Sequence, residues 1–187
     1  SRTTLEREVD SMAFKLTQKE QRLLSDQLNH EKVCIEKYNN YAQQVKDPQL
    51  KQMFGQYASE EQNHYDTVSQ LLSGQQANTG MGMSAGAGPG GQQGEPQRQR
   101  QGERQSWEGA GLQGAVSGAG MTNQEDATIL GDMLMTEKFV SGAYDTAIFE
   151  SANSDVRQTL QHIQKEEQQH GEGIFNYMSQ HGMYNPK

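Results

Sequence analysis

Cysteine is almost absent from this chain of 187 residues, because Cys34 is the only one. A single thiol excludes an intrachain disulfide and any Cys-x-x-Cys metal knuckle. Hydrophobic residues are scarce as well, at 32% of the sequence with a mean hydropathy of −0.94. We therefore expect part of the chain to lack a packed core. The length itself is that of one domain of ordinary size.

Three further absences limit the classes of function that we expect for this chain. No apolar run approaches the length of a membrane span, and no secretory signal is visible, so we expect neither a membrane span nor secretion by such a signal. Basic residues are outnumbered by acidic ones, 16 against 24, and the net charge is −8. This balance gives no electrostatic case for nucleic acid as a partner.

The middle of the chain differs in composition from its flanks. Residues 74–121 consist mainly of Gly, Gln and Ser, with breaks at Pro89 and Pro96. We predict a flexible linker there, because so little apolar surface cannot offset the entropy of ordering. Its only large aromatic residue, Trp107, is either a stray hydrophobe or a group that docks onto the folded part.

The two flanks repeat each other. Residues 23–64 align without a gap on residues 129–170, a shift of 106 positions (137 − 31). The repeat pairs Glu60-Glu61-Gln62-x-His64 with Glu166-Glu167-Gln168-x-His170. We read each copy as one helical hairpin. The predicted segments are a tail at 1–17, a first hairpin at 18–73, the linker, a second hairpin at 122–182 and a tail at 183–187.

Local signals place the ends of four helices, at 18–46, 48–73, 123–152 and 154–181. Thr17-x-x-Glu20 and Thr122-x-x-Glu125 have the pattern of capping boxes. Asp47-Pro48 supplies an N-cap with proline at the first helical position, and Asn153 caps the last helix. Gly74 and Gly182 are expected terminators.

Apolar residues recur in each helix at alternating steps of four and three, which is the spacing of a helical bundle. In the first helix this predicted buried stripe includes Leu28 and Ile35. Six polar residues also fall on the stripes and are expected at one height in the bundle: Glu31, Glu61, His64, Glu137, Glu167 and His170. The spacing places Glu20, Lys37, Glu60, Lys165 and Glu166 off the stripes.

The charge of the six residues indicates what they bind. Burying a carboxylate costs several kcal/mol, and four together repel one another. Two divalent cations would match four negative charges, with neutral imidazoles completing the ligand set. Carboxylate oxygen with imidazole nitrogen suits iron or manganese, with zinc as a further option. The simpler alternative, that these are surface charges on misplaced helices, fits a lone Glu-x-x-His but not two copies in a gapless repeat.

Other residues receive plainer interpretations. We expect Tyr38 and Tyr144 to serve as core packing rather than to contact the ligands or carry redox chemistry. His30, His162 and His181 are expected to face solvent. Cys34 is expected to be an inert small hydrophobe.

The paired Glu and Glu-x-x-His motifs resemble those of ferritin-like di-iron and di-manganese carboxylate proteins. The run from Leu134 to Pro186, which contains MTEK, YDTAIFE, EEQQH and the ending YMSQHGMYNP, closely resembles the coat F family of bacterial endospore coat proteins. The first hairpin resembles the same ferritin-like unit more distantly. The resemblance implies an all-α, ferritin-like four-helix bundle with a long crossover linker. It also implies a spore coat location, reached from the cytoplasm, with other spore coat proteins as partners.

Three hypotheses for function remain open at this point. The first is a coat component that holds metal for stability or storage. The second is a di-metal redox enzyme of manganese-catalase or oxidase type. The third is a scaffold with a vestigial site. The presence of all six residues argues against this hypothesis. The linker is long enough for hairpins to pair between chains, so a homo-oligomer or swapped dimer is also expected.

Overall fold

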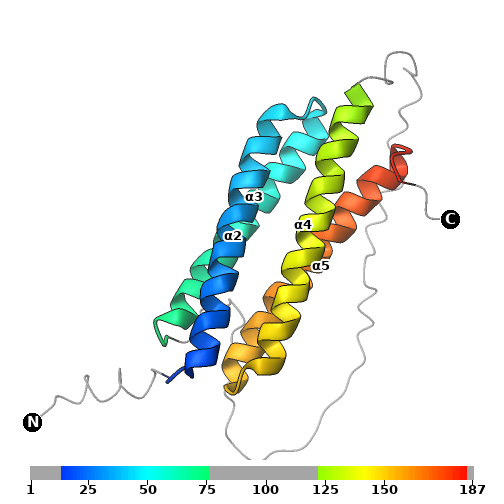
Figure 1. Ribbon diagram of the computed structural model, residues 1–187. Helices are drawn as coiled ribbons and strands as arrows, with labels where there is room; N and C mark the ends of the chain where they lie inside the picture. Colours follow the sequence, from blue (N-terminus) through cyan, green and yellow to red (C-terminus); the bar gives the residue numbers. More distant parts are fainter. Residues whose placement is uncertain (1–13, 76–121, 185–187) are drawn as a thin grey trace, which may run out of the picture. The chain divides into compact units, whose positions relative to one another are not determined.

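The structure is a computed structural model that describes residues 14–75 and 122–184, and within them the chain forms four α-helices. The helices are α2 (Gln18–Gln44), α3 (Pro48–Leu72), α4 (Thr122–Glu150) and α5 (Ser154–Gln180). α2 and α3 form one hairpin, α4 and α5 form the other, and α2 packs alongside α4 (Figure 1). The predicted all-α fold of two helical hairpins is confirmed, and every predicted helix boundary lies within two residues of the observed one.

Several predicted segments fall largely outside the described residues. These are the tail at 1–17, the linker at 74–121 with Trp107, and the tail at 183–187, so the division into these segments stays a prediction. The end of the first tail is an exception. Leu16 is buried, and the Phe14 amide donates a hydrogen bond to the Gly74 carbonyl at 3.1 Å. This short stretch therefore packs on the bundle next to the end of α3.

The helix ends follow the local signals. Thr17 and Glu20 form a complete capping box, in which each side chain accepts from the other's backbone amide. The Asp47 side chain accepts from Gln49 N, and Asn153 accepts from the first amides of α5. At the end of α3, Gly74 has a φ of +76°, the left-handed conformation that glycine adopts without strain. The predicted box at Thr122 involves a side chain outside the described ones.

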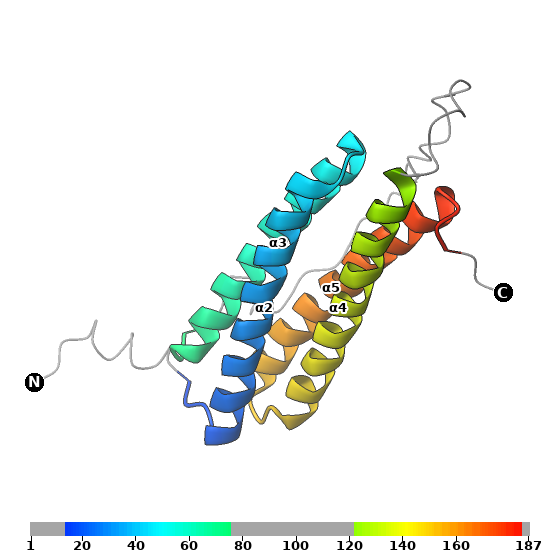
Figure 2. The same cartoon turned by 45° about the horizontal axis from the view of Figure 1, so that its top comes forward.

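Neighbouring helices run antiparallel throughout the bundle. α4 begins at the end of the bundle where α2 finishes, and the two run side by side in opposite directions (Figure 2). Since α2 and α4 are equivalent elements of the repeat, this arrangement relates the two hairpins by an approximate two-fold rotation. Contacts that cross the bundle should therefore come in matched pairs.

The core consists of two apolar clusters with a polar layer between them. One cluster gathers around Leu24, Val68, Tyr144 and Leu160, and the other around Tyr38, Phe54, Leu130 and Ile174. Along α3, α4 and α5 the sequence-selected Glu and His residues come between members of the two clusters, and on α2 Glu31 lies between Leu24 of the first and Tyr38 of the second. Apolar side chains on both sides keep water from this layer, so charges in it interact strongly.

The first helix corrects two details of the predicted stripe. Gln27 and Cys34 are buried, whereas Leu28 and Ile35, which we placed on the stripe, are half-buried. Cys34 is fully covered, and burial raises the pKa of its thiol, in keeping with an inert side chain. Our placement of Glu20 off the buried face is wrong. Glu20 is 1% exposed because its carboxylate accepts hydrogen bonds from the amides of Ala152 and Asn153 in the α4–α5 turn.

Candidate metal centre

All six residues selected from the sequence meet in the polar layer. Glu31 comes from α2, Glu137 from α4, and α3 and α5 each contribute a Glu-x-x-His pair one helical turn apart. Every one of the six is at most 2% exposed. The structure thus brings together all the residues of the sequence hypothesis, and their assignment as metal ligands stays a prediction.

The six residues form two overlapping groups whose ligand atoms lie within 4.8 Å of one another. One group is Glu31, Glu61, His64 and Glu167, and the other is Glu61, Glu137, Glu167 and His170. Glu61 and Glu167 belong to both groups, so they occupy the middle of the centre. Each group takes three residues from one hairpin and one from the other, which neither hairpin can supply alone.

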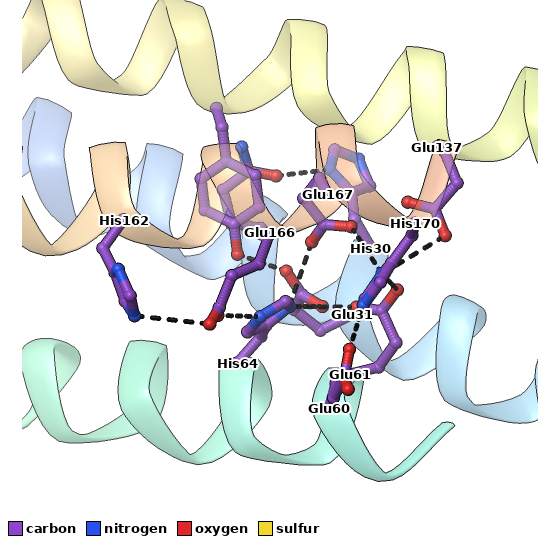
Figure 3. Close-up of polar contacts among 12 residues, drawn as sticks. His30, Glu31, Glu60, Glu61, His64, Glu137, His162, Glu166, Glu167 and His170 are labelled. Atoms are coloured by element: carbon purple, nitrogen blue, oxygen red, sulfur yellow. Dashed lines mark hydrogen bonds and ion pairs between the residues drawn. The ribbon is translucent and has the colours of Figure 1, made fainter. Parts of the chain in front are cut away.

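The imidazoles face this middle through Nδ1 (Figure 3). His64 Nδ1 lies 3.2 Å from both Glu61 Oε2 and Glu167 Oε1. His170 Nδ1 lies 3.2 Å from Glu61 Oε1 and 3.7 Å from Glu167 Oε2. The two rings are stacked with their centroids 5.8 Å apart. The two shared carboxylates therefore lie between two inward-facing nitrogens.

Several buried oxygens in the centre receive no well-aligned hydrogen bond, although the histidine Nδ1 atoms lie 3.2 and 3.7 Å from those of Glu167. They are Glu31 Oε2, Glu137 Oε2 and both carboxylate oxygens of Glu167. A buried acceptor left without a donor costs about 1–3 kcal/mol, and more when it carries charge. Cations among these oxygens would satisfy them. The unpaired oxygens are the observation that makes the donor set fit a metal centre.

The two outer carboxyl groups favour the protonated form. Burial is the largest cause that raises the pKa of Glu31 and Glu137 well above the usual range, and the negative charge of Glu167 adds to it. Burial also acts to raise the pKa of the shared residues Glu61 and Glu167. The close contacts with the His170 and His64 rings outweigh burial and lower the pKa of both carboxyl groups. The shared carboxylates therefore carry the negative charge.

Both histidines favour the charged form when no cation is present. Burial acts to lower the pKa of His64, but its hydrogen bonds to Glu166, Glu167 and Glu61 raise that pKa to about 12. The pKa of His170 is also raised far above its usual range, because bonds to Glu137, Glu167 and Glu61 outweigh burial. Two imidazolium rings thus balance two carboxylates. The neutral imidazoles expected from the sequence require a metal to replace the Nδ1 protons.

Sequence reasoning missed two carboxylates that contact the histidines from outside. Glu166 Oε2 lies 2.8 Å from His64 Nε2, and Glu60 Oε2 lies 2.6 Å from His170 Nε2. Both residues are off the buried stripe, as predicted, and are about a third exposed. The repeat held the signal that could have found them, because Glu occupies both positions. The side chain of His162, which we expected to face solvent, is about a third exposed, and its Nε2 atom lies 3.4 Å from Glu166 Oε1 (Figure 3).

Two tyrosines also contact the centre, contrary to our reading of them as core packing alone. The Tyr38 hydroxyl donates a hydrogen bond to Glu137, and the Tyr144 hydroxyl donates one to Glu31. Each bond joins α2 to α4. A heptad separates each tyrosine from the glutamate on its own helix, and only the antiparallel packing of α2 and α4 brings it to the glutamate of the other hairpin. Both rings are fully buried, so they also pack the core.

A bundle of two helical hairpins around a buried layer of four carboxylates and two imidazoles defines the ferritin-like class of protein. A family model for the Coat F domain matches residues 19–75 and 125–187, which is more than half of the chain. The chain therefore belongs to the Coat F family of spore coat proteins. The match extends to the first hairpin, for which the sequence alone showed a more distant likeness. No curated protein and no solved structure matches the chain.

None of the helices in the described part of the chain is long and apolar enough to cross a membrane.

Proposed function

We propose that this protein is a spore coat component whose buried centre holds two divalent cations, iron or manganese, with zinc as a further option. Glu31, Glu61, His64 and Glu167 would hold one cation, and Glu61, Glu137, Glu167 and His170 the other. The cations would stabilise the bundle or be kept in reserve in the coat. They would bring the Lewis acidity and, for iron or manganese, the electron transfer that this set of ligands supports.

The unpaired buried oxygens carry this proposal. Structural helix pairs do not need four carboxyl groups between two apolar clusters, and buried oxygens without a donor stay costly there even when two imidazolium rings balance the charge. Two divalent cations supply four positive charges against four negative ones. Hydrogen bonds from Tyr38 and Tyr144 hold the two outer carboxylates in place, so the chain's own groups orient the ligands.

Metal content is the direct test. Protein purified without chelator or affinity metal, after growth with ample iron and manganese, should contain about two such ions per chain by elemental analysis. The double variant Glu61→Ala, Glu167→Ala should lose most of the metal, because it removes both shared carboxylates. A double variant at exposed positions, Glu36→Ala with Glu172→Ala, is the matched control and should keep it. Near-zero metal in the wild type would overturn the proposal.

A second candidate function is a di-metal redox enzyme of manganese-catalase or oxidase type. The shared carboxylates favour it, since they would place two cations side by side. The two phenols donate hydrogen bonds to Glu137 and Glu31 and so hold the outer ligands of the proposed cation pair. Oxygen evolution from peroxide by metal-loaded wild type, compared with the variant His64→Ala, His170→Ala, tests this candidate. Equal background rates would leave the coat component without catalysis.

Location and partners complete the proposal. We infer that the chain reaches the coat from the cytoplasm of the sporulating cell and packs there with other spore coat proteins. We also infer self-association, as a homo-oligomer or a swapped dimer. Each half of the centre draws on both hairpins, so the same contacts can form within one chain or between two. Crosslinking of intact coats, followed by identification of the linked peptides, would separate these arrangements.

A further inference from the structure

Each histidine of the centre is held at both ring nitrogens. Nδ1 faces the shared carboxylates, while Nε2 contacts a glutamate that stands at the rim of the bundle. For His64 that glutamate is Glu166, and for His170 it is Glu60. Both glutamates are neighbours in sequence of a shared carboxylate, but their side chains point to the histidine of the opposite hairpin.

We propose that Glu60 and Glu166 are positioning residues, each of which orients the imidazole of the opposite hairpin so that its Nδ1 atom can bind metal. The inference rests on the proposed function. A neutral imidazole has one N–H and one lone pair, and the hydrogen bond made by one nitrogen sets which of the two carries the proton. A carboxylate that accepts the Nε2 proton leaves the lone pair on Nδ1, where the centre needs it. Such partners also raise the basicity of the ligand.

The repeat supports this role independently of the distances. Glu occupies both equivalent positions, 60 and 166. The residues of the centre and the two tyrosines are likewise identical in the two copies of the repeat. The residues that surround Glu60 and Glu166 differ between the two copies. Glu60 accepts a hydrogen bond from the Gln56 amide, whereas the equivalent of Gln56 beside Glu166 is His162. Both copies of the repeat thus keep a glutamate at this position, although the residues around it differ.

The contacts also connect helices that otherwise approach little. α3 and α5 have few close backbone approaches, unlike the helices within each hairpin. The pair Glu60–His170 and the pair Glu166–His64 cross between them in opposite directions. Correct orientation of either ring therefore requires both hairpins to be docked. In a separate hairpin the histidine would lose its contact with Glu60 or Glu166, and its metal group would lack the fourth residue.

Exposure makes the role separable from folding. Glu60 and Glu166 have side chains that are 37% and 38% exposed, so water can replace the carboxylate when it is removed. A substitution at either position should leave the fold of the metal-free protein close to wild type. The effect should appear in the histidine ring and in metal affinity.

The test uses the full chain loaded with Zn²⁺, a diamagnetic probe, and long-range ¹H–¹⁵N spectra of its histidines. Wild type should show both rings protonated at Nε2 and bound at Nδ1. Glu166→Leu should remove the protected Nε2 proton of His64 while His170 keeps its own, and Glu60→Leu should do the reverse. Each variant should weaken zinc binding at one position by about 10- to 100-fold.

Two controls sharpen the result. Glu172→Leu removes an exposed carboxylate from the same helix as Glu166 and should change neither ring nor affinity. Glu166→Gln keeps an acceptor oxygen and should lose less affinity than Glu166→Leu. Zinc binding by wild type with unaltered rings and affinity in the leucine variants would overturn the positioning role alone. Absence of zinc binding by wild type would overturn both the proposed function and this role.

Discussion

Metal binding should release protons, and the number follows from the charges in the polar layer. The pKa of His64 is raised to about 12 and that of His170 further still, so in metal-stripped protein both rings are protonated at pH 7. Two protons must leave before both Nδ1 atoms can bind metal. Glu31 and Glu137, whose pKa values are raised well above the usual range, hold up to two more. Loading of two cations should therefore release between two and four protons per chain.

This release gives metal affinity a steep pH dependence with a definite sign. Each released proton changes the binding free energy by ~1.36 kcal/mol per pH unit. Two to four protons thus strengthen the binding of the cation pair by about 2.7 to 5.4 kcal/mol for each unit of rising pH. Binding should weaken by the same amount as the pH falls.

Calorimetric titration with Mn²⁺ in two buffers of different ionisation enthalpy counts the protons directly. The variant Glu31→Gln, Glu137→Gln should release up to two fewer protons, because glutamine has no carboxyl proton to lose while both imidazolium rings keep their contacts with Glu61 and Glu167. Release of fewer than two protons by wild type at pH 7, or an affinity that does not change with pH, would refute the charge assignment.

Three further predictions concern stability and the ligands. Gly173→Ala should destabilise the bundle by about 1–3 kcal/mol in urea unfolding, because a Cβ there would overlap the Tyr57 hydroxyl, whereas Gly171→Ala, with only ordinary contacts, should be neutral or stabilising. Glu20→Gln should cost about 1–3 kcal/mol near pH 7. Burial opposes the shift, but hydrogen bonds lower the pKa of Glu20, so its stabilisation is present above the unfolded pKa. It is lost as pH falls through the folded value, where melting curves of variant and wild type should converge. Tyr38→Phe should weaken metal binding without loss of helicity, and an unchanged zinc affinity would show that its hydroxyl is not needed.

The sequence was sufficient for the helices and the inner centre because both depend on regular spacing. Helix ends came from capping residues that act within one turn, such as Thr17 and Asp47. The six inner residues came from a heptad-like pattern interrupted by charge, and the repeat showed that the interruption was no accident. These are local or periodic signals, and a single sequence contains them.

The rest depended on how the hairpins meet, which spacing along one helix does not reveal. Glu20 is off the apolar stripe, yet it is buried because the α4–α5 turn packs over it. Tyr38 reaches Glu137, and Glu60 reaches His170, only through the antiparallel arrangement of the two copies. The repeat keeps Tyr38 and Glu60 in the second copy as Tyr144 and Glu166, so identity between copies was a better guide to these contacts than the burial pattern.

The two shared carboxylates have a consequence for how the centre would fill and empty. Glu61 and Glu167 each belong to both groups, so removing either cation withdraws the charge that both groups depend on. A single divalent ion would leave the layer short of positive charge and its second group partly protonated. Binding at one position should therefore change the affinity of the other, and a coat that loses its metal should take up protons from its surroundings as it does so.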